Sequence, residues 1–474
     1  MKIYNTLSRS IEEFEPINPP KVGMYACGPT VYDYSHIGHM RKYINDDVLV
    51  RTLRANGYEV QHVMNVTDVG HLTSDADSGE DKLEKGAAKL GKDVLEVARM
   101  FEDDFWKSLK LVNVETPNVI CRATEHIEDQ IALIETLVEK GFTYQTDQAI
   151  YFDVSKFPDY TKLSGQSLDE KISGARSEVV TDKKKKNPAD FALWFFTVGR
   201  FANHALRWKS PWASPLAPER SDGRRGEGFP GWHIECSAMS MKYLGLTFDI
   251  HTGGVDHIPV HHTNEIAQSE AATGQKFANY FFHSSHLSVD GQKMSKSLGN
   301  FYRITDLVHE KFNPLAFRYL TFQTHYRMEM NFTWEALAAA QEALVRLYDV
   351  ASRFDEVHKH PDIDFEREFL DAAGLDLNMS KALSVVWEML SSNLSAPVKA
   401  ATLFKMDEVL GLKLKENSRH IIDIPENIMK QVREREKMRK QKKFVQADHL
   451  RARIEKAGYI VEDQEKGARV TRKV

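Results

Sequence analysis

Residues 21–40, KVGMYACGPTVYDYSHIGHM, hold the local pattern that decides the fold. Apolar residues alternate over 22–26 and predict a short strand, and a turn-rich loop then leads to His-Ile-Gly-His at 36–39. Apolar residues recur with helical spacing over 40–53, and Asn56-Gly57 is a typical helix end. In open α/β folds a phosphate binds where a strand and loop lead into a helix, because free amide groups and the helix dipole favour an anion. We therefore expect an α/β fold with an anion site beside these histidines.

The same loop carries four chemically useful side chains. Cys27 stands at the end of the predicted strand, Asp33 follows, and the imidazoles of His36 and His39 flank a dipeptide that contains glycine. Thiolates and imidazoles bind metals, and imidazoles also donate to phosphates. The alternative is structural, because a free cysteine is often simply buried and a single histidine is usually satisfied by a neighbour. The loop alone leaves both interpretations open.

Composition predicts a cytoplasmic protein with about three domains. The chain has 474 residues, of which 42% are hydrophobic and 28% charged, and about 150 residues form an average domain. The N-terminal residues include no apolar run of signal-peptide length, and no segment approaches the roughly 20 apolar residues of a membrane span. Cys27, Cys121 and Cys236 are too few for a disulfide framework, which indicates a reducing compartment.

Charge is distributed unevenly along the chain. The formal net charge is −5, so a nucleic acid would have to be held by local basic patches. Residues 430–443 contain eight Lys or Arg residues and two acids, which is such a patch. The four successive lysines at 183–186 are more typical of a solvated loop.

Periodicity divides the chain into six segments. After the first helix it predicts a strand at 58–68, a short surface helix within 74–91, helices at 93–111 and 116–142, and a small hairpin at the end of the chain. We expect two halves of one α/β domain at 1–113 and 201–300, an insertion between them at 114–200, a linker at 301–335, an all-α bundle at 336–415 and a small basic region at 416–474.

Cys236, His261 and Glu265 form a second group of chemically useful residues. His261 and Glu265 lie four residues apart, so they project from one face of a predicted helix, and Cys236 lies on an earlier helix. Two such ligands with a thiolate are typical of zinc, and Cys27 could supply the fourth donor. His262 faces about 100° away on an ideal helix and could exchange roles with His261. Buried thiols beside an ordinary surface helix remain the structural alternative.

The segment Lys293-Met294-Ser295-Lys296-Ser297 forms a predicted loop after an apolar strand. Its two ammonium groups could neutralise a leaving pyrophosphate without proton transfer. A loop with two lysines is most often plain surface. The pairing with the histidine tetrapeptide in the other half of the α/β domain favours the catalytic interpretation.

The chain resembles class I aminoacyl-tRNA synthetases, whose signatures HIGH and KMSKS occur here unaltered at 36–39 and 293–297. More narrowly, it is similar to cysteinyl-tRNA synthetases along nearly its whole length. The stretches that carry this resemblance are YACGPTVYDYSHIGH (25–39), NVTD (65–68), RATEHI (122–127), PADFALW (188–194), GWHIECSAM (231–239), GGVD (253–256), HHTNEIAQSEA (261–271) and KMSKSLGN (293–300).

This resemblance implies a Rossmann-like class I catalytic domain with a connective insertion and a stem-contact linker, followed by a tRNA-binding helical bundle and a basic anticodon-recognition region. It implies activation of cysteine to cysteinyl-adenylate and transfer to the 3′-terminal ribose of cysteine tRNA. ATP, cysteine and cysteine tRNA would be the partners, with one zinc ion per chain and magnesium accompanying ATP. We expect a monomer that does not bind membranes.

Site residues carry over from the family by position. The resemblance implies that Cys27, Cys236, His261 and Glu265 bind zinc and that Gly28, Thr67, Trp232 and Asp256 shape the cysteine pocket. It further implies that His36, His39, Gly254, Asp256, Lys293 and Lys296 contact ATP, with the two histidines and two lysines acting in catalysis.

The chain also departs from the family pattern. Phe195 replaces a basic residue that is common after PADFALW, and Val470 replaces the tryptophan of a GTRW-like ending. An acidic extension follows NVTD, and segment 196–229 is long and rich in Arg and Gly. If that tryptophan stacks on a base, anticodon reading here would depend more on Arg469 and nearby charges.

Two rival functions share parts of this pattern. The cysteine ligase of mycothiol synthesis resembles these enzymes in its zinc and nucleotide sites but joins cysteine to an amino sugar and has a truncated C-terminus. A non-catalytic RNA-binding paralogue should have lost signature residues. The basic tail and the intact signatures favour the synthetase.

Overall fold

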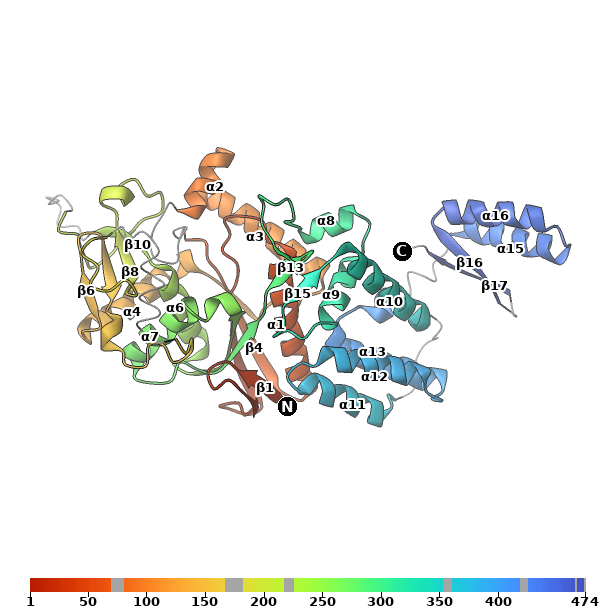
Figure 1. The fold of residues 1–474 in the computed structure, drawn as a ribbon, viewed down its shortest axis with the longest axis horizontal. Coiled ribbons are helices and arrows are strands. Elements are labelled where there is room, and N and C mark those ends of the chain that lie inside the picture. Colours follow the sequence, from red (N-terminus) through yellow and green to blue (C-terminus); the bar gives the residue numbers. More distant parts are fainter. Residues whose placement is uncertain are drawn as a thin grey trace.

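The computed structural model describes residues 1–69, 81–166, 182–216, 226–352, 360–417, 425–464 and 467–472. Figure 1 shows an elongated molecule with an insertion at one end, helix α1 (Ile37–Ala55) in the middle, a helical bundle beyond it and a small C-terminal unit at the other end. The start of the acidic extension, up to residue 80, and residues 217–225 of the Arg/Gly-rich segment lie outside the described residues. Within the described ranges no helix combines the length and apolarity needed to cross a membrane.

Five parallel strands in the order β12-β11-β3-β4-β5 form the central sheet, which confirms the α/β expectation. They are β3 (Lys21–Ala26), β4 (Glu59–Val66), β5 (Val119–Arg122), β11 (Phe248–Gly254) and β12 (Ala278–Ser284). Strands β4 and β5, which follow β3 in the sequence, extend the sheet on one side of β3. Strands β11 and β12, much later in the sequence, extend it on the other side. The strand order therefore reverses between β3 and β11, and a ligand cleft opens beyond the carboxyl ends of strands at such a point.

Helix α1 follows β3 as the sequence predicts. It begins directly after His36, whose side chain accepts from the backbone N–H of His39, and it ends at Asn56 before Gly57, which has a φ of 88°. The apolar positions expected to support it, including Met40, Ile44 and Val48, are buried.

The helix predicted at 116–142 is wrong in its first part. Residues Val119–Arg122 form strand β5 at the edge of the central sheet, and α4 occupies only Ile127–Glu139. Val119 and Ile120 are β-branched and pair in parallel with Val63 and Met64 of β4. A four-residue strand is too short to show its own periodicity, so the amphipathic pattern of α4 extended over it.

An antiparallel sheet in the order β6-β7-β8-β10-β9 begins in the segment expected as the insertion, 114–200, and continues past residue 200, because β9 and β10 lie in the segment expected as the second half of the α/β domain. Its strands are β6 (Thr143–Gln145), β7 (Ala149–Phe152), β8 (Phe191–Phe196), β9 (Trp208–Lys209) and β10 (Glu227–Pro230). Strand β8 is buried throughout, and Phe195, noted above as a departure, packs on Phe201 and Phe229. An aromatic residue there therefore belongs to a hydrophobic core rather than to a basic surface.

Four further helices and one short hairpin accompany the sheets. The helices are α2 (Lys82–Leu90), α3 (Val94–Leu111), α6 (Trp232–Leu244) and α7 (His261–Thr273), and the hairpin joins β1 (Lys2–Asn5) to β2 (Ser10–Glu13). Helices α6 and α7 pack on each other and on α4, and residues of these helices share one hydrophobic core with the central sheet.

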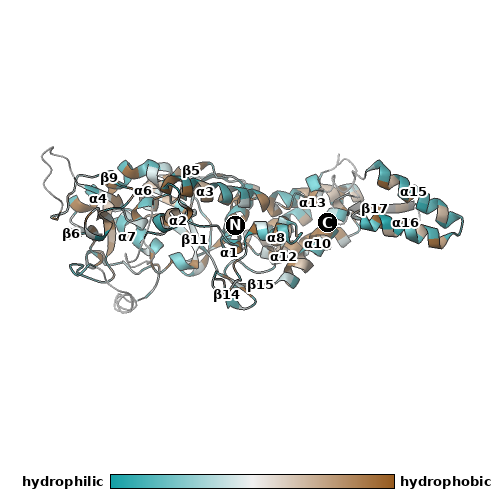
Figure 2. Cartoon of the chain, turned by 90° about the horizontal axis from the view of Figure 1, so that it is seen from above, coloured by the Kyte–Doolittle hydropathy of each residue, from teal (hydrophilic) through white to brown (hydrophobic). Residues whose placement is uncertain are grey.

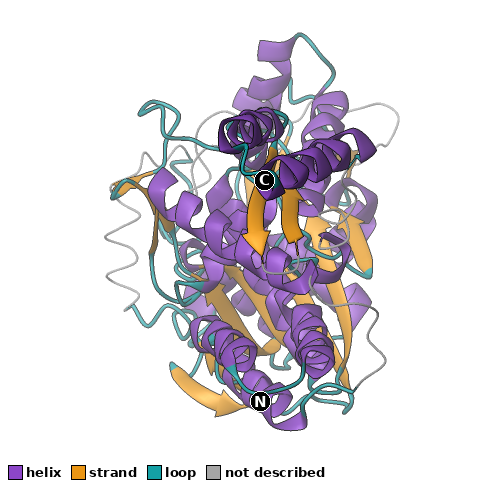
Figure 3. Ribbon diagram, turned by 90° about the vertical axis from the view of Figure 1, so that its right-hand side faces the viewer, coloured by secondary structure: helices purple, strands orange, loops and turns teal. Residues whose placement is uncertain are grey.

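The second half of the chain is mainly helical, as expected beyond about residue 333. A small sheet comes first, in the order β14-β13-β15, with β13 (Leu287–Val289), β14 (Gln292–Lys293) and β15 (Met330–Phe332). The helices are α8 (Ile304–His309), α9 (Pro314–Phe322), α10 (Trp334–Ser352), α11 (Ile363–Gly374), α12 (Met379–Ser391) and α13 (Ala396–Leu410). Figure 3 views the chain from the side of its C-terminal unit, with helices in purple and strands in orange.

The C-terminal unit comprises α15 (Glu426–Lys440), α16 (Phe444–Lys456) and the predicted hairpin of β16 (Tyr459–Gln464) and β17 (Gly467–Arg472). It has its own small core, in which Val470 is buried against Ile428, Val432 and Val461. In Figure 2 most of α15 and α16 is coloured as hydrophilic. Val470 is therefore a core residue of a charged, independent unit.

A buried ion pair joins the central domain to the bundle. The Arg318 guanidinium, which has no exposed side-chain area, donates to Asp47 Oδ2 at 2.5 Å, to Leu410 O at 2.6 Å and to two carbonyls after α3. Burial acts to raise the pKa of Asp47, but Arg318 and Arg51 outweigh it and hold that pKa below its ordinary value. One arginine thus links α1, α3, α9 and α13.

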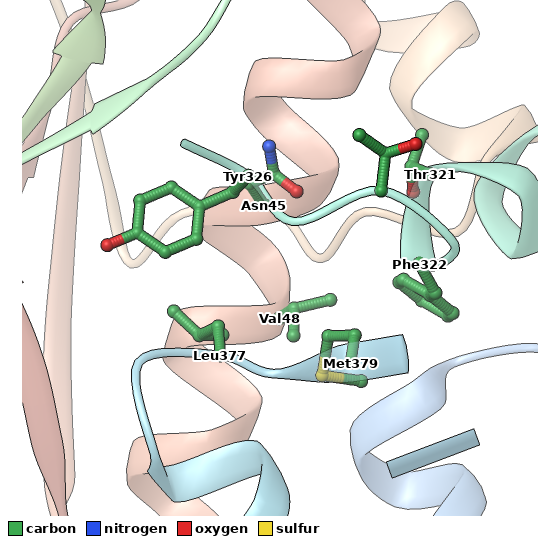
Figure 4. A pocket seen from close by; sticks show the side chains of 8 residues that line it. Asn45, Val48, Thr321, Phe322, Tyr326, Leu377 and Met379 are labelled. Atoms are coloured by element: carbon green, nitrogen blue, oxygen red, sulfur yellow. The ribbon is translucent and has the colours of Figure 1, made fainter. Parts of the chain in front are cut away.

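A small cavity lies beside this junction. Figure 4 shows its lining side chains, which come from α1, α9 and the segment that enters α12. They are Asn45, Val48, Thr321, Phe322, Thr324, Tyr326, Leu377 and Met379. The centre of a water molecule can occupy about 10 Å³ of this cavity, so the cavity has room for about one water.

We predict that Arg318→Met destabilises the protein by about 3 kcal/mol, because the variant leaves several buried carbonyls and part of the Asp47 charge without a partner. Arg367→Met is the matched control, since Arg367 is 66% exposed and pairs only at the surface with Asp364. Thermal unfolding of both variants measures the difference. Equal melting temperatures would show that Arg318 does not hold the junction.

Candidate functional site

Residues from both halves of the α/β domain meet at the carboxyl ends of β3 and β11. Cys27 follows β3, and its N–H donates to Thr252 O of β11 at 3.1 Å. Helix α7, which carries His261 and Glu265, begins shortly after β11, and Cys236 lies on α6, which packs against α7. The strand reversal therefore gathers side chains that are far apart in the sequence.

Four predicted metal ligands form one buried cluster. The ligand atoms of Cys27, Cys236, His261 and Glu265 all lie within 4.8 Å of one another. A second set replaces Cys236 and His261 by His251 and His262 and satisfies the same limit. The structure therefore brings the predicted set together and also brings in His262, the neighbour that sequence left as an alternative.

Hydrogen bonds orient the side chains of this cluster, and His262 Nε2 lies 3.3 Å from Cys27 Sγ. His251 Nε2 lies 2.7 Å from Glu265 Oε2, whereas Glu265 Oε1 is buried without a hydrogen bond and lies 3.4 Å from His261 Nε2. The other nitrogen of His261 lies 3.0 Å from His233 Nδ1. His261 Nε2 and Glu265 Oε1 are thus left to face each other, as ligand atoms do when neighbours orient the remainder of each side chain.

The thiols complete a donor set suited to a thiophilic metal. Burial acts to raise the pKa of Cys27, but the Cys236 thiol and the imidazoles of His262 and His251 hold it well below its ordinary value. The pKa of Cys236 is raised, by burial and by the Cys27 thiolate. Two thiols, one imidazole and one carboxylate oxygen form a tetrahedral zinc-type donor set. The residues present therefore fit a metal ion.

The two histidines of the first signature stack on each other across Gly38. Their ring centroids are 3.6 Å apart, and a Cβ at Gly38 would lie 2.9 Å from the His36 ring. Burial and the neighbouring His39 lower the pKa of His36 to about 3. His36 is therefore a neutral imidazole at pH 7, and it can donate a hydrogen bond to a phosphate oxygen but supplies no charge.

The lysine loop reaches the other side of the same cleft. Lys296 Nζ forms an ion pair with Asp33 of the loop after β3 and lies 5.1 Å from the centre of the Phe301 ring. Phe301 in turn meets the His36 ring edge to face, with centroids 5.2 Å apart. Lys293 lies in β14 with its side chain exposed. The structure thus brings Lys296 close to the first signature and leaves Lys293 at the rim.

Gly28 and Thr67 lie together at the ends of β3 and β4. Gly28 N donates to Asn65 Oδ1 at 2.8 Å, and Asn65 Nδ2 donates to Thr67 Oγ1 at 3.1 Å. A Cβ at Gly28 would lie 1.7 Å from the carbonyl oxygen of Asn65, so only glycine fits. Thr67 Oγ1 donates to the buried carboxylate of Glu235 at 2.9 Å.

Trp232, Gly254 and Asp256 lie around the metal cluster. The Trp232 ring stacks on His261 with centroids 4.4 Å apart. Gly254 ends β11, and a Cβ there would lie 2.3 Å from Asp256 Oδ1. The Asp256 side chain is 65% exposed and lies 3.9 Å from His257. Trp232 therefore borders the metal cluster directly, while Asp256 lies at the open side of the site.

Glu235, His251 and His283 belong to the surroundings of the site but were not singled out by the sequence analysis. Glu235 is fully buried, and burial raises its pKa well above the ordinary value. His251, His262 and His283 form a buried series in which His262 Nδ1 lies 2.8 Å from His283 Nε2. The position of His251 in the apolar strand β11 is the one local sign, because a histidine inside a buried parallel strand needs a specific partner.

Comparisons with known proteins show which family this chain is similar to. Residues 13–342 match the family model of the class I (C) tRNA synthetase catalytic domain, and residues 423–470 match the cysteinyl-tRNA ligase anticodon binding domain. The chain is 45% identical over 471 residues to cysteine–tRNA ligase 1 of Burkholderia lata, covering 99% of this chain and 96% of that protein. It is 43% identical over 498 residues to the cysteine–tRNA ligase of Treponema denticola, covering 98% of each.

Solved structures support the fold. The methionyl-tRNA synthetase of Mycobacterium tuberculosis in complex with methionyl-adenylate superposes with a TM-score of 0.56 at 16% identity, covering 83% of this chain and 90% of that one. A LeuRS–tRNA–LeuAMS complex from Agrobacterium radiobacter K84 gives a TM-score of 0.59 at 13% identity and covers 86% of each chain.

We predict that Cys236→Ser abolishes metal binding, because a serine hydroxyl is a poor ligand where a thiolate is expected. Cys121→Ser is the matched control, since Cys121 is equally buried but donates to Met64 O outside the cluster. Elemental analysis of the purified variants gives the metal content. A full complement of metal in Cys236→Ser would refute the assignment.

Proposed function

Since this chain belongs to the cysteinyl-tRNA synthetases, class I enzymes that ligate cysteine to its tRNA, we propose that its cluster of Cys27, Cys236, His261 and Glu265 holds the zinc ion that recognises cysteine. The observation that carries this proposal is the buried donor set with an unpaired Glu265 Oε1 beside His261 Nε2. Neither rival function is favoured, because the matched anticodon binding domain and the intact signatures both argue for tRNA charging.

The donor set explains how serine could be rejected. Serine differs from cysteine chiefly by one oxygen for sulfur, and a shape pocket discriminates weakly between near-isosteres. Zinc bound there supplies a Lewis acid that prefers a thiolate to a hydroxyl. The Trp232 ring beside His261 would form a wall for the small substrate side chain, and Gly28 lets the chain after β3 pass close to the Asn65 carbonyl.

Activation of cysteine requires alignment more than proton transfer. The substrate carboxylate is already an anion when it attacks the α-phosphate of ATP, so no general base is needed. Neutral His36 and the adjacent His39 would donate to phosphate oxygens, and Lys293 and Lys296 would offset charge on the leaving pyrophosphate. Gly254 and Asp256, at the end of β11 and just after it, would border the nucleotide, with magnesium accompanying ATP.

The ion pair between Lys296 and Asp33 gives the lysine loop a defined position before ATP binds. An incoming triphosphate is a stronger anion than one carboxylate, so Lys296 would exchange Asp33 for phosphate. This exchange would keep the loop near the first signature.

The C-terminal unit would bind the anticodon region of the tRNA. Helix α15 and the turn after it carry the basic segment 430–443, and Phe444, the first residue of α16, is 56% exposed beside it. A basic surface with an exposed aromatic ring suits single-stranded RNA, which binds through phosphate contacts and stacking. We further propose that the protein acts as a monomer in the cytoplasm.

Cysteine-dependent exchange between ATP and pyrophosphate, followed by charging of cysteine tRNA, tests the function. Both activities are expected. Exchange without charging would instead favour a ligase for an amino sugar, and the absence of both would favour an RNA-binding paralogue.

We predict that Lys296→Ala lowers the exchange rate by about a hundredfold or more, because one preorganised cation at developing charge is lost. The apparent affinity for cysteine should stay within about twofold, and Lys296→Arg, which keeps the charge, should retain more activity. Steady-state kinetics with each substrate varied give the two effects. Normal turnover with weakened cysteine affinity would contradict a role at the phosphates.

We predict that deletion of the chain after Asn417 impairs tRNA charging far more than pyrophosphate exchange. The deleted unit has its own core, so its removal should leave the catalytic core folded. Exchange and charging are measured on the same preparation, with circular dichroism as the control for folding. An equal loss of both activities would argue against a role confined to tRNA.

A further inference from the structure

A buried lysine of α1 contacts the backbone of a proposed metal ligand. Lys42 Nζ lies 2.7 Å from the carbonyl oxygen of Cys27 and 2.8 Å from Asp46 Oδ2. Its side chain is 11% exposed, and that of Asp46 is 2% exposed. A lysine is almost never buried to this extent without a specific partner, and here it has two.

The Cys27 carbonyl needs this partner because of where the strand ends. Ladder pairing of β3 stops at Ala26, the Cys27 N–H still bonds to Thr252 O, and the chain then turns so that Gly28 N meets Asn65 Oδ1. The carbonyl between these two amides is turned away from both neighbouring strands and toward α1. An unpaired buried carbonyl is costly, so the Lys42 ammonium caps the end of β3.

The same side chain lies next to the nucleotide half of the site. Lys42 is three residues after His39 and therefore lies on the same face of α1, one turn further along. Asp46 is four residues later on that face and holds the ammonium in place. His39, Lys42 and Asp46 therefore lie in a row along one face of α1. His39 is the proposed ATP contact, Lys42 caps the Cys27 carbonyl, and Asp46 pairs with Lys42.

We propose that Lys42, held by Asp46, is a positioning residue that fixes the zinc ligand Cys27 relative to His36 and His39. This inference rests on the proposed role of Cys27 as a metal ligand. It makes α1 the element that sets the distance between bound cysteine and bound ATP, because one rigid helix carries both the histidines and the support for the ligand. Groups that orient metal ligands are worth about tenfold to a hundredfold in metal affinity or activity.

Two double variants separate the hydrogen bond from the charge. Lys42→Met with Asp46→Leu removes both charges and the donor, whereas Lys42→Gln with Asp46→Asn removes the charges and keeps an N–H donor for the Cys27 carbonyl. Paired substitution avoids leaving Asp46 as an unpaired buried charge. Asn45→Ala on the same helix is the matched control, because Asn45 donates to Ser284 Oγ and does not touch Cys27.

Zinc affinity of the full-length protein, measured by competition with a chelator, is the first readout. We expect the Met/Leu variant to bind zinc about tenfold to a hundredfold more weakly, and the Gln/Asn variant and Asn45→Ala to stay within about threefold of the wild type. The second readout is kinetic. The KM for cysteine should rise in the Met/Leu variant by more than the KM for ATP.

These outcomes keep the inference separate from the proposed function. Absence of zinc from the wild type would overturn the proposed zinc site itself. Zinc bound by the wild type, with wild-type affinity in the Met/Leu variant, would overturn only the role of Lys42. If the Met/Leu variant does not fold, Lys42→Met with Asp46→Asn takes its place as the variant without a donor for the Cys27 carbonyl: zinc binding at least tenfold weaker than in the Gln/Asn variant supports the donor role, and equal affinity in the two variants overturns it.

Discussion

Helix α1 is buried on almost every side, and the rest of the structure depends on this constraint. Its apolar residues pack into the core, while its polar residues are also covered and therefore need fixed partners. The Arg41 guanidinium donates to four carbonyls of segments 285–286 and 325–328. Asp47 binds Arg318, and Lys42 binds the Cys27 carbonyl. Each contact ties a different part of the chain to one helix.

This arrangement connects the stability of the protein with its chemistry. The N-terminus of α1 presents His36 and His39 to the cleft, its middle contacts the end of β3, and its C-terminal half is clamped to the bundle. A helix anchored at so many points cannot shift easily, because buried polar groups lose their partners when they move. Two reactants held on such an element need little further ordering before they react.

In the candidate metal cluster, the proposed ligands could be predicted from local sequence, whereas the residues that orient them could not. Local spacing predicts that His261 and Glu265 share a helical face, and the structure shows them 3.4 Å apart. The hydrogen bond from His251 to Glu265 and the contact of His233 with His261 depend on strands and helices that meet only in the fold. These supports leave one nitrogen and one oxygen facing each other, while His262 Nε2 lies 3.3 Å from Cys27 Sγ, so both histidines border the cluster.

The sequence alone determined the α/β class, the strand, loop and helix at 21–57, both signatures and the residue types of the metal set. These features are local, because helical and strand periodicities and short motifs are properties of neighbouring residues. Tertiary structure alone decided that residues 119–122 join the sheet, that Lys296 pairs with Asp33, and that Lys42 supports Cys27. A short edge strand and a buried charge are stable only with partners far along the chain, and no local sequence pattern indicates which residues those partners are.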